Sequence, residues 1–457
     1  MEYDYDAVRG RLSAKVLEGR APGVWKYSEL LPCVKGPVVS LGEGGTFLHD
    51  CKRLAEELGA KKLFVKDETT NPTGSFVDRG MTVAVSMAKA EGYLGVACGP
   101  AGNLAASLAA YSAKAGLGCT AHVTRVIDLG KLYQVIAYGA DVKYVKENEN
   151  NAPFANNGLT IDPVDPFLLQ GLKTTGYELV EQMGWRTHAR VVIPMGNGTH
   201  ISMVWRGINE LKMIGLIDGD LPIMDGVQVS GASPIVDAFR DCSNQRHPPT
   251  PKEVPMDINI KEPLMKDLAV RSIKESNGNA VVVSEKEIIE AMRALAKKEG
   301  IFAEPAAAST IAAMKKLLEE GSIDRGDEVV CVITGTGLKD PMVARKMVKQ
   351  LKNLESMVRQ KEERGLTTEL GLTKLKILSI IAKGSSSYGY SIWKQLTLND
   401  NLRIQLPSLY QHLSELEALH LIQREGVAKK EGRADRSYYS ITARGKQVLS
   451  KIKELAS

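Results

Sequence analysis

The chain has 457 residues, of which 44% are hydrophobic and 25% are charged, and its net charge is +5. These values are typical of a folded globular protein of about two to four domains and exclude a chain dominated by disorder. No apolar run reaches the ~18 residues of a membrane span, and the acidic opening MEYDYD lacks the basic and apolar regions of a signal peptide. We therefore expect a cytoplasmic protein without a membrane partner.

The positive charge is concentrated near the C-terminus. Residues 366–457 hold fourteen Lys and Arg against eight Asp and Glu, whereas the preceding 365 residues hold 45 against 46. A phosphate-rich partner for this segment is compatible with the charge, although small domains reach such values by chance. The six cysteines stand far apart without a C-x-x-C pair, so the sequence supports neither a metal site nor a disulfide framework.

From residue 63 to residue 340, short β-branched or apolar runs alternate with helical patterns. The expected strands are KLFVKD, GVACG, CTAHVT, DVKYV, RVVIPMG, GVQVSG and EVVCVITG, and the expected helices span 78–91, 103–116, 129–138 and 200–214. This alternation predicts an α/β domain with open, mainly parallel sheets. Such sheets place ligand loops at the carboxyl ends of their strands, where this sequence has GSFVDR, GPAGN, GNGTH and TGTGLKD.

The stretch GSFVDR has the pattern of a capping box. Ser75 is expected to accept from the amide of Asp78 while the Asp78 carboxylate reaches back to Ser75. Val77 would then lie in the first helical turn, with its side chain directed into the site.

A charged helical stretch at 342–365 separates this region from the C-terminal end. Met347, Leu351, Leu354 and Val358 follow one another at steps of four, three and four. Two heptads are compatible with a dimerising coiled coil and equally with a single amphipathic helix. We expect a ligand-binding domain at 1–341, this linker at 342–365, and a separate domain at 366–457.

The C-terminal segment predicts three helices followed by a β-hairpin and a last helix at 443–455, which is the order of a winged helix-turn-helix. The third helix, LPSLYQHLSELEALHLI, has Leu406, Leu409, Leu413, Leu416 and Leu419 on one face. Double-stranded DNA is the expected partner, although a solvated basic loop is common and some winged helices bind proteins. The expected contacts are Ser408, Tyr410, Gln411 and His412 to base edges, and Lys429, Lys430, Arg433 and Arg436 of the hairpin to the phosphate backbone.

The stretches ILSIIAKGSSSYGYSIWKQL, LPSLYQHLSELEALHLI and RSYYSITARGKQVL resemble the PadR-type winged-helix transcriptional regulators. The likeness covers about ninety residues. Those regulators are typically dimers on palindromic operators, so the resemblance implies a homodimer and a role for the heptad stretch.

The region 22–341 resembles threonine synthase and, more loosely, the fold-type II pyridoxal phosphate enzymes, which have the tryptophan synthase β-like fold. The stretches that carry the likeness are GVWKYSELLP, LGEGGTFL, VKDETTNPTGSFVDRG, GKLYQVIAYGADV, VIPMGNGTH, EGIFAEPAAAS and VITGTGLKDP. In that family the residue matching Val77 is the lysine that holds the cofactor and shuttles protons. Valine has no titratable group, so the resemblance implies a site without its nucleophile and general base. Lys66, part of VKDE, is not expected to substitute.

Other positions of the family site are partly kept. Family members usually have hydroxyl residues where GPAGN has Pro100 and Ala101. Asn103 matches the asparagine that contacts the cofactor's ring oxygen, and Thr334 matches the hydroxyl facing the pyridine nitrogen. Gly196, Asn197, Gly198, Thr199 and His200 would cradle a phosphate at a helix N-terminus, although Thr199 and His200 differ from the usual Gly and Asn. These remnants are alternatively inherited turns without a ligand.

Two functions remain open at this point. The first is a DNA-binding transcriptional regulator whose catalytically inactive threonine synthase-like domain senses a small phosphorylated ligand. The expected ligand is non-covalent pyridoxal phosphate, its imine with an amino acid, or a molecule like O-phosphohomoserine, and no other cofactor is expected. The second is an active pyridoxal phosphate-dependent lyase with an appended regulatory domain. An engineered inactivating change at Val77 would also explain the missing amine, but the divergent GPAGN loop argues for natural divergence.

Overall fold

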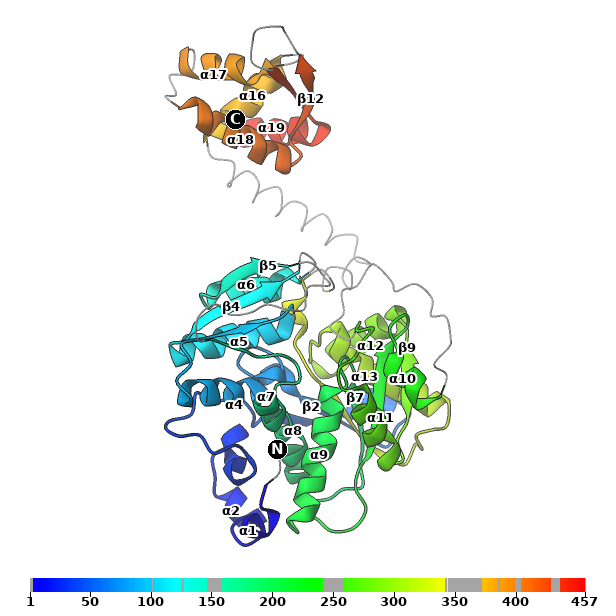
Figure 1. Ribbon diagram of the computed structural model, residues 1–457. Coiled ribbons are helices and arrows are strands. Elements are labelled where there is room, and N and C mark those ends of the chain that lie inside the picture. The colour runs from blue at the N-terminus through cyan, green and yellow to red at the C-terminus, as the bar shows by residue number, and fades with distance from the viewer. Residues whose placement is uncertain are drawn as a thin grey trace. The chain divides into compact units, whose positions relative to one another are not determined.

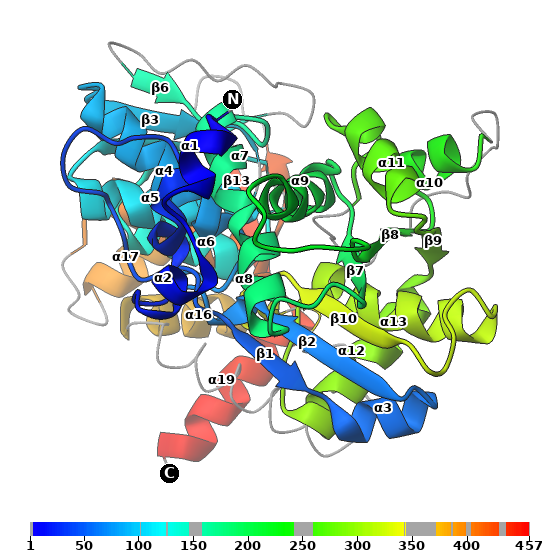
Figure 2. The same cartoon turned by 90° about the horizontal axis from the view of Figure 1, so that it is seen from below.

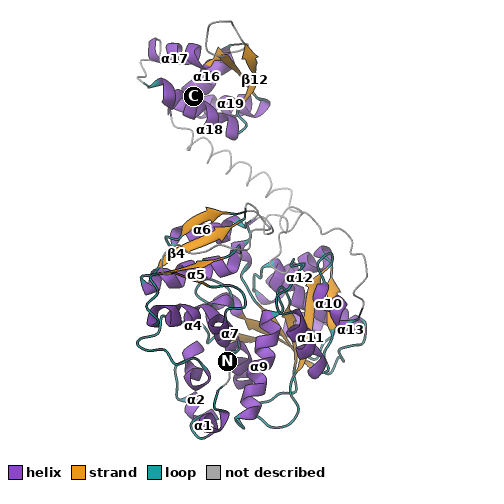
Figure 3. Ribbon diagram, viewed as in Figure 1, coloured by secondary structure: helices purple, strands orange, loops and turns teal. Residues whose placement is uncertain are grey.

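The structure is a computed structural model that describes residues 3–100, 102–124, 127–145, 158–241, 259–341, 343, 372–384, 387–398, 404–428 and 436–456. The chain divides into two compact units, residues 1–347 and 348–457, each of which has its own hydrophobic core. Figure 1 colours the chain by residue number, from blue at the N-terminus to red at the C-terminus. Figure 3 shows that each unit combines helices with strands. Within the described residues, no helix is both long enough and apolar enough to cross a membrane.

The larger unit contains a sheet of six strands in the order β1-β2-β10-β7-β8-β9. The strand at one edge, β1, is antiparallel to β2, and all other neighbours are parallel. The strands span Phe47–Asp50 (β1), Lys62–Asp67 (β2), Arg190–Pro194 (β7), Ile223–Val229 (β8), Ala280–Val283 (β9) and Glu328–Ile333 (β10).

Both faces of this sheet are buried, and successive residues of β10 show why. Val329, Cys331 and Ile333 pack in the core beneath α3 (Lys52–Leu58), α12 (Glu285–Glu299) and α13 (Pro305–Glu319). Val330 and Val332 pack on the opposite side, among residues of α8 (Thr174–Gln182), α9 (Thr199–Met213) and α11 (Lys266–Glu275). A strand with two buried faces needs an unbroken apolar run, which is the pattern of EVVCVI.

A second sheet of four parallel strands has the order β5-β4-β3-β6. Its strands span Gly95–Cys98 (β3), Gly118–Val123 (β4), Asp141–Tyr144 (β5) and Gly158–Thr160 (β6). Figures 1 and 2 show α8 and α9 between the two sheets. In α9, Met203 packs in the core of the four-stranded sheet while Val204 packs against the six-stranded sheet.

The helices of the larger unit complete its layers. They span Tyr5–Arg9 (α1), Ala14–Glu18 (α2), Lys52–Leu58 (α3), Val77–Ala90 (α4), Gly102–Ala115 (α5), Leu129–Ala137 (α6), Pro166–Leu172 (α7), Thr174–Gln182 (α8), Thr199–Met213 (α9), Pro234–Phe239 (α10), Lys266–Glu275 (α11), Glu285–Glu299 (α12) and Pro305–Glu319 (α13), with short 3-10 turns at Val24–Leu30 (η1), Glu68–Thr70 (η2) and Gly337–Lys339 (η3). Helices α4 and α7 approach each other so closely that a Cβ at Gly171 would overlap the carbonyl oxygen of Arg79.

The smaller unit contains helices α16 (Leu372–Lys383), α17 (Gly389–Leu398), α18 (Leu406–Ala418) and α19 (Ala443–Ala456). Its sheet has the order β11-β13-β12, formed by Ser387–Tyr388 (β11), Ile422–Ala428 (β12) and Arg436–Ile441 (β13). The antiparallel β12–β13 pair begins with Ile422 opposite Ile441. The predicted α/β class with an appended winged helix-turn-helix is therefore confirmed, and the long predicted helices agree with the structure to within one or two residues.

Candidate functional site

The turn that precedes α4 positions Val77, and it differs from the predicted capping box. Helix α4 begins at Val77, its N-cap residue is Phe76, and no side chain caps it. The Ser75 hydroxyl accepts from the Val77 amide at 3.4 Å rather than from that of Asp78, whose amide donates to the backbone oxygen of Ser75. The Asp78 carboxylate does not reach back to Ser75, so the capping-box prediction was wrong.

The carboxylate of Asp78 has other partners that explain this error. It accepts from the Thr73 amide and the Thr73 hydroxyl, each at 2.7 Å, and from the Ser107 hydroxyl at 2.5 Å. Burial raises the pKa of Asp78, although these hydrogen bonds oppose the shift. The aspartate therefore ties the turn to α5, and the helix begins without a side-chain cap.

The turn before Val77 lies beside Thr334 because it is joined to the loop after β10. The Phe76 amide donates to the Thr334 carbonyl oxygen at 2.9 Å, and Ser75 forms a β-bridge with Gly335. Val77 is 8% exposed and Thr334 is 3% exposed. An apolar side chain without a nitrogen is thus buried beside this loop.

The GNGTH loop lies between β7 and the first turn of α9. Gly198 is the N-cap residue with a φ of 80°, a left-handed conformation that favours glycine. A Cβ at Gly198 would also come within 2.9 Å of both the Ala269 Cβ and the Met265 carbonyl oxygen. The Asn197 side chain accepts from the Leu264 amide at 3.3 Å, so it anchors the loop. The loop therefore leads into the N-terminus of α9, a helix of fifteen residues. The first N–H groups and the dipole at a helix N-terminus attract an anion.

The side chains of Thr199 and His200 have different hydrogen-bond and stacking partners. The Thr199 hydroxyl is directed to the carbonyl oxygen of Pro163 at 3.5 Å. The His200 ring stacks on Phe76 with centroids 4.1 Å apart, and its Nε2 shares a hydrogen bond with the Thr175 hydroxyl at 3.1 Å. The other ring nitrogen, Nδ1, is buried without a hydrogen-bond partner among the described residues. Burial lowers the pKa of His200 to about 3, so its ring is neutral at physiological pH.

Asn103, in the first turn of α5, is 7% exposed and joins a polar cluster that the sequence did not reveal. Its amide nitrogen donates to the Glu304 carboxylate at 3.2 and 3.3 Å, and its amide oxygen accepts from Lys339 at 2.8 Å. Lys131 lies 3.9 Å from Glu304. The three charged residues belong to the motifs AEPAAAS, TGTGLKD and GKLYQ, but their spacing gives no sign that they meet.

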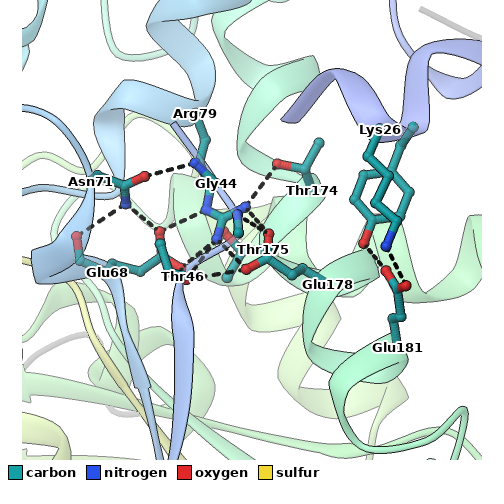
Figure 4. A network of polar contacts seen from close by, with 12 residues as sticks. Lys26, Gly44, Thr46, Glu68, Asn71, Arg79, Thr174, Thr175, Glu178 and Glu181 are labelled. Atoms are coloured by element: carbon teal, nitrogen blue, oxygen red, sulfur yellow. Dashed lines mark hydrogen bonds and ion pairs between the residues drawn. The ribbon is translucent and has the colours of Figure 1, made fainter. Parts of the chain in front are cut away.

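A second buried cluster lies where the α4 turn meets β2 and α8, and Figure 4 shows it. Arg79 donates to Glu68 at 2.6 Å and to Glu178 at 2.9 Å, and all three side chains are almost fully buried. Lys66 donates to Glu178 at 2.5 Å, to the Thr46 carbonyl oxygen at 2.9 Å and to Gln182 at 2.8 Å. Burial opposes the charged form of Glu178, but Arg79 and then Lys66 outweigh it and hold its pKa below the usual range. The Lys66 amine is thus engaged in this cluster.

In the smaller unit, the leucine face of α18 is buried as predicted. Leu409, Leu413 and Leu416 are in the core, and Leu406 and Leu419 pack against it. Of the candidate base contacts, Tyr410 and Gln411 are exposed, whereas Ser408 and His412 are partly buried. Gln411 donates to Glu415 at 3.1 Å.

His412 lies beside an ion pair that links α18 to α16. Its Nδ1 is 3.6 Å from Glu415, a carboxylate that also pairs with Lys374 of α16 at 2.7 Å. Of the hairpin cations, Lys429, Lys430 and Arg433 lie outside the described residues, and Arg436 begins β13 without a described side chain. The heptad residues Met347, Leu351, Leu354 and Val358 also lie outside the described residues.

Two family models match the chain. Residues 39–335 match the model of pyridoxal-phosphate dependent enzymes, and residues 377–451 match the transcriptional regulator PadR-like family. The first match includes every candidate residue of the larger unit, and the second includes every candidate DNA contact.

Curated relatives and solved structures agree with the first match. The chain is 45% identical to the threonine synthase of Methanocaldococcus jannaschii over 75% of its own length and 87% of the relative, and 40% identical to that of Methanosarcina acetivorans over 74% and 85%. The L-serine ammonia-lyase of Rhizomucor miehei has a similar fold, with a TM-score of 0.54, 20% identity, and 64% of this chain and 93% of that chain covered. A threonine deaminase of Solanum lycopersicum is similar at a TM-score of 0.53 and 22% identity, over 68% and 83% of the two chains.

Proposed function

The chain belongs to the family of pyridoxal-phosphate dependent enzymes, and from this premise and its PadR-like C-terminal domain we propose that it is a DNA-binding transcriptional regulator. In this proposal the threonine synthase-like domain is catalytically inactive. It binds a small phosphorylated ligand, and binding controls the winged helix.

One observation carries the proposed inactivity, which is the valine at position 77. The family resemblance places the reactive lysine there, and Val77 is a buried apolar residue at the start of α4. Loss of a covalent nucleophile that is also the general base removes several kcal/mol of transition-state stabilisation, on the order of a 10³-fold or larger loss of rate. The amine of Lys66 does not replace the missing lysine amine, because it donates to three acceptors in the buried cluster around Arg79.

The proposed ligand carries a phosphate because the residues of the GNGTH loop fit one. The left-handed Gly198 and the N-terminus of α9 offer an anion several donors, and Nδ1 of His200 adds one in the tautomer that carries its proton there. Pyridoxal phosphate would be held here by Gly196, Asn197, Gly198, Thr199 and His200, with its ring between Asn103 and Thr334 and no bond to Val77. Its imine with an amino acid, or an O-phosphohomoserine-like molecule, would use the same phosphate subsite.

The proposed control of DNA binding follows the usual rule for an effector. A ligand shifts DNA affinity only by binding the DNA-competent and the incompetent state with different affinities. We place the ligand-binding domain at residues 1–341, the linker at 342–365 and the DNA-binding domain at 366–457. A homodimer joined through the linker would present two recognition helices to a palindromic operator.

A mobility shift of the full chain on operator DNA, selected from genomic fragments, tests this function. We expect binding in the nanomolar range that changes at least fivefold when pyridoxal phosphate, its mixture with threonine, or O-phosphohomoserine is added. Calorimetry on the same protein should give a dissociation constant for the ligand that changes the DNA affinity. The proposal is contradicted if the chain binds no DNA, or if its DNA affinity is the same with and without each of these ligands.

The second candidate is an active pyridoxal phosphate-dependent lyase, and the 45% identity to a threonine synthase favours it. This function requires an amine other than one at position 77. A protein that forms threonine from O-phosphohomoserine, and carries pyridoxal fixed to a lysine after borohydride reduction, would establish the lyase. A colourless protein without turnover would exclude it.

A further inference from the structure

One edge of the four-stranded sheet exposes several large apolar side chains. Leu129, Tyr133 and Ile136 of α6 are 46%, 64% and 55% exposed, and Tyr144 of β5 is 63% exposed. The three residues of α6 follow one another at steps of four and three, so they form a single stripe along the helix. We call these four residues the α6–β5 patch.

Helix α6 and strand β5 are neighbours in the fold as well as in the chain. The Ala140 amide donates to the Val135 carbonyl oxygen at 3.2 Å, and the helix packs against the strand (Figure 1). Val135 and Val142 belong to the same hydrophobic core. Because alternate residues of a strand point to the same face, Tyr144 shares the face of Val142, against which α6 packs. The patch therefore lies on one face of the sheet, at its β5 edge.

The patch is large for the surface of a single chain. A tyrosine buries about 150–250 Å² when it is fully covered, so the four partly exposed side chains present roughly 400 Å² to solvent. Apolar patches of this size often mark an interaction surface. A stable dimer buries about 800 Å² on each partner, so the patch supplies roughly half of the area that such an interface needs. The rest would come from the backbone and polar side chains of the sheet edge.

Strand β5 carries charges that suit a second copy of itself. Within the described residues, β5 pairs only with β4, so its outer edge has no partner strand there. Asp141 and Lys143, on either side of Val142, are both exposed. If two β5 strands pair antiparallel with Val142 opposite its own copy, each Asp141 lies opposite the partner's Lys143. Opposite charges directly across two strands attract, so the edge is self-complementary in this register.

The other edge of the same sheet is protected against such pairing. Strand β6 has three residues, Gly158–Thr160, and its large apolar side chain, Leu159, packs against the core. Short edge strands and edge lysines both discourage the pairing of sheets. Lys143 would have this effect on β5, but the Asp141 of a second copy would neutralise it. The two edges therefore differ in how readily they accept another strand.

We propose that the α6–β5 patch and the outer edge of β5 form an interface with a second copy of this chain. The two β5 strands pair antiparallel about a two-fold axis at Val142 and join the two sheets into one of eight strands. An axis perpendicular to the sheet keeps both α6 helices on the same face, so the two apolar stripes lie on either side of it. The inference does not rest on the proposed function, because this association requires neither ligand nor DNA.

Charge reversal in the full chain tests the register. Sedimentation equilibrium measures the dissociation constant between copies of the chain. D141K and K143D each place like charges opposite one another at two positions of the dimer, so each should raise this constant about tenfold or more. The double variant D141K/K143D restores opposite charges across the strands. It should return the constant to within about threefold of that of the unsubstituted chain.

A second pair of variants tests the apolar part of the interface. I136S should raise the dissociation constant about tenfold or more, because it removes apolar area that the second copy covers. M213S is the matched control, since Met213 at the end of α9 is 49% exposed and lies outside the patch. It should leave the constant unchanged. Far-UV circular dichroism of every variant verifies that the chain remains folded.

A full chain that stays monomeric would overturn the interface, even if this face captured a different protein. A dissociation constant that neither single reversal changes would also overturn it, and would show that the copies associate elsewhere, for example through the linker at 342–365. Single reversals that the double variant does not rescue would contradict the two-fold register. Equal effects of I136S and M213S would contradict the role of the patch. The mobility shift and the ligand titrations judge the proposed function separately.

Discussion

His200 combines two features that rarely occur together in a buried side chain. It stacks on Phe76 at the α4 turn, and its Nδ1 remains without a partner among the described residues at the N-terminus of α9. In the tautomer that carries its proton on Nδ1, the ring has a buried donor without a partner, which costs about 1–3 kcal/mol and which a bound phosphate would recover by accepting from it. We therefore expect His200, one of the two residues of this loop that depart from the family pattern, to contact the ligand.

The titration of His200 predicts how the free energy of unfolding depends on pH. Its folded pKa, about 3, is below its unfolded pKa, so the unfolded chain binds the proton more readily. Stability from this residue is complete above about pH 6.5 and is lost as the pH falls toward 3, by an amount on the order of a few kcal/mol. Urea unfolding of the wild type and H200N at pH 7.5 and pH 5 measures the difference.

H200N should lose less stability between these two pH values than the wild type, because asparagine does not titrate. Other acidic groups affect both proteins equally, so the comparison isolates the histidine. An identical loss in the two proteins would show that His200 is already accessible to protons in the folded chain.

A second prediction concerns the replacement of Val77 by lysine. V77K should retain pyridoxal phosphate through dialysis, because the new amine lies where the family holds the cofactor, whereas the wild type should release it. Threonine formation by V77K should remain low, since the GPAGN loop lacks two hydroxyl donors. Replacing Pro100 and Ala101 by serine and threonine in V77K should raise turnover on the order of 10²-fold or more, the usual effect of restoring one or two positioned donors.

Absorption spectra, peptide mapping after borohydride reduction and a threonine assay check each step of this prediction. The unsubstituted chain is the control for covalent attachment. Covalent pyridoxal in that control would contradict the argument from Val77 and favour the lyase.

Among the elements, the α4 turn depends on the Arg79 cluster. Arg79 connects α4 to η2 through Glu68 and to α8 through Glu178, and its guanidinium is fully buried. Removing it would leave two buried carboxylates without their main partner. We expect R79M to lower the free energy of unfolding by about 3–5 kcal/mol, as measured by urea titration.

R271A is a suitable control for R79M. The ion pair of Arg271 with Glu275 is on the surface, where the two side chains are 67% and 51% exposed. Its loss should change stability by less than about 0.5 kcal/mol. Equal effects of R79M and R271A would show that the buried network contributes no more than a surface pair.

The contrast between β10 and Asp78 shows what the sequence could predict. Strand EVVCVI and the helix after GNGTH were predictable because burial on two faces, or on one stripe, imposes a local pattern. The partners of Asp78 were not predictable, because Ser107 comes from another helix. The same holds for Glu304 and Asn103, which lie 201 residues apart in sequence. Periodicity locates elements, but polar partners from distant elements become visible only in three dimensions.

At the scale of the whole molecule, the chain combines a threonine synthase-like domain with a PadR-like domain. Each unit has a separate core, so each can retain its function while the other changes. From the break in the helical pattern at RGLTTELG, the sequence predicts a domain boundary near residue 366, and the bounds 1–341, 342–365 and 366–457 stay predictions. Dimerisation through the heptad stretch stays a prediction, since those residues lie outside the described part.

The last prediction concerns how the C-terminal domain recognises DNA. Lys429 and Arg433 belong to the basic hairpin loop, whereas Gln411 is on the exposed side of α18, whose leucine face is buried. Phosphate contacts release counterions without reading sequence, so K429A/R433A should weaken binding to every DNA and reduce the salt slope by about 2 per DNA-bound chain. Q411A should leave the salt slope unchanged and lower the preference for the operator by about 1–3 kcal/mol, because base-edge contacts carry specificity. Mobility shifts at several salt concentrations, with operator and scrambled DNA, measure both quantities. If the two variants have the same effect on slope and preference, the assignment of α18 to the bases and of the hairpin to the phosphates is wrong.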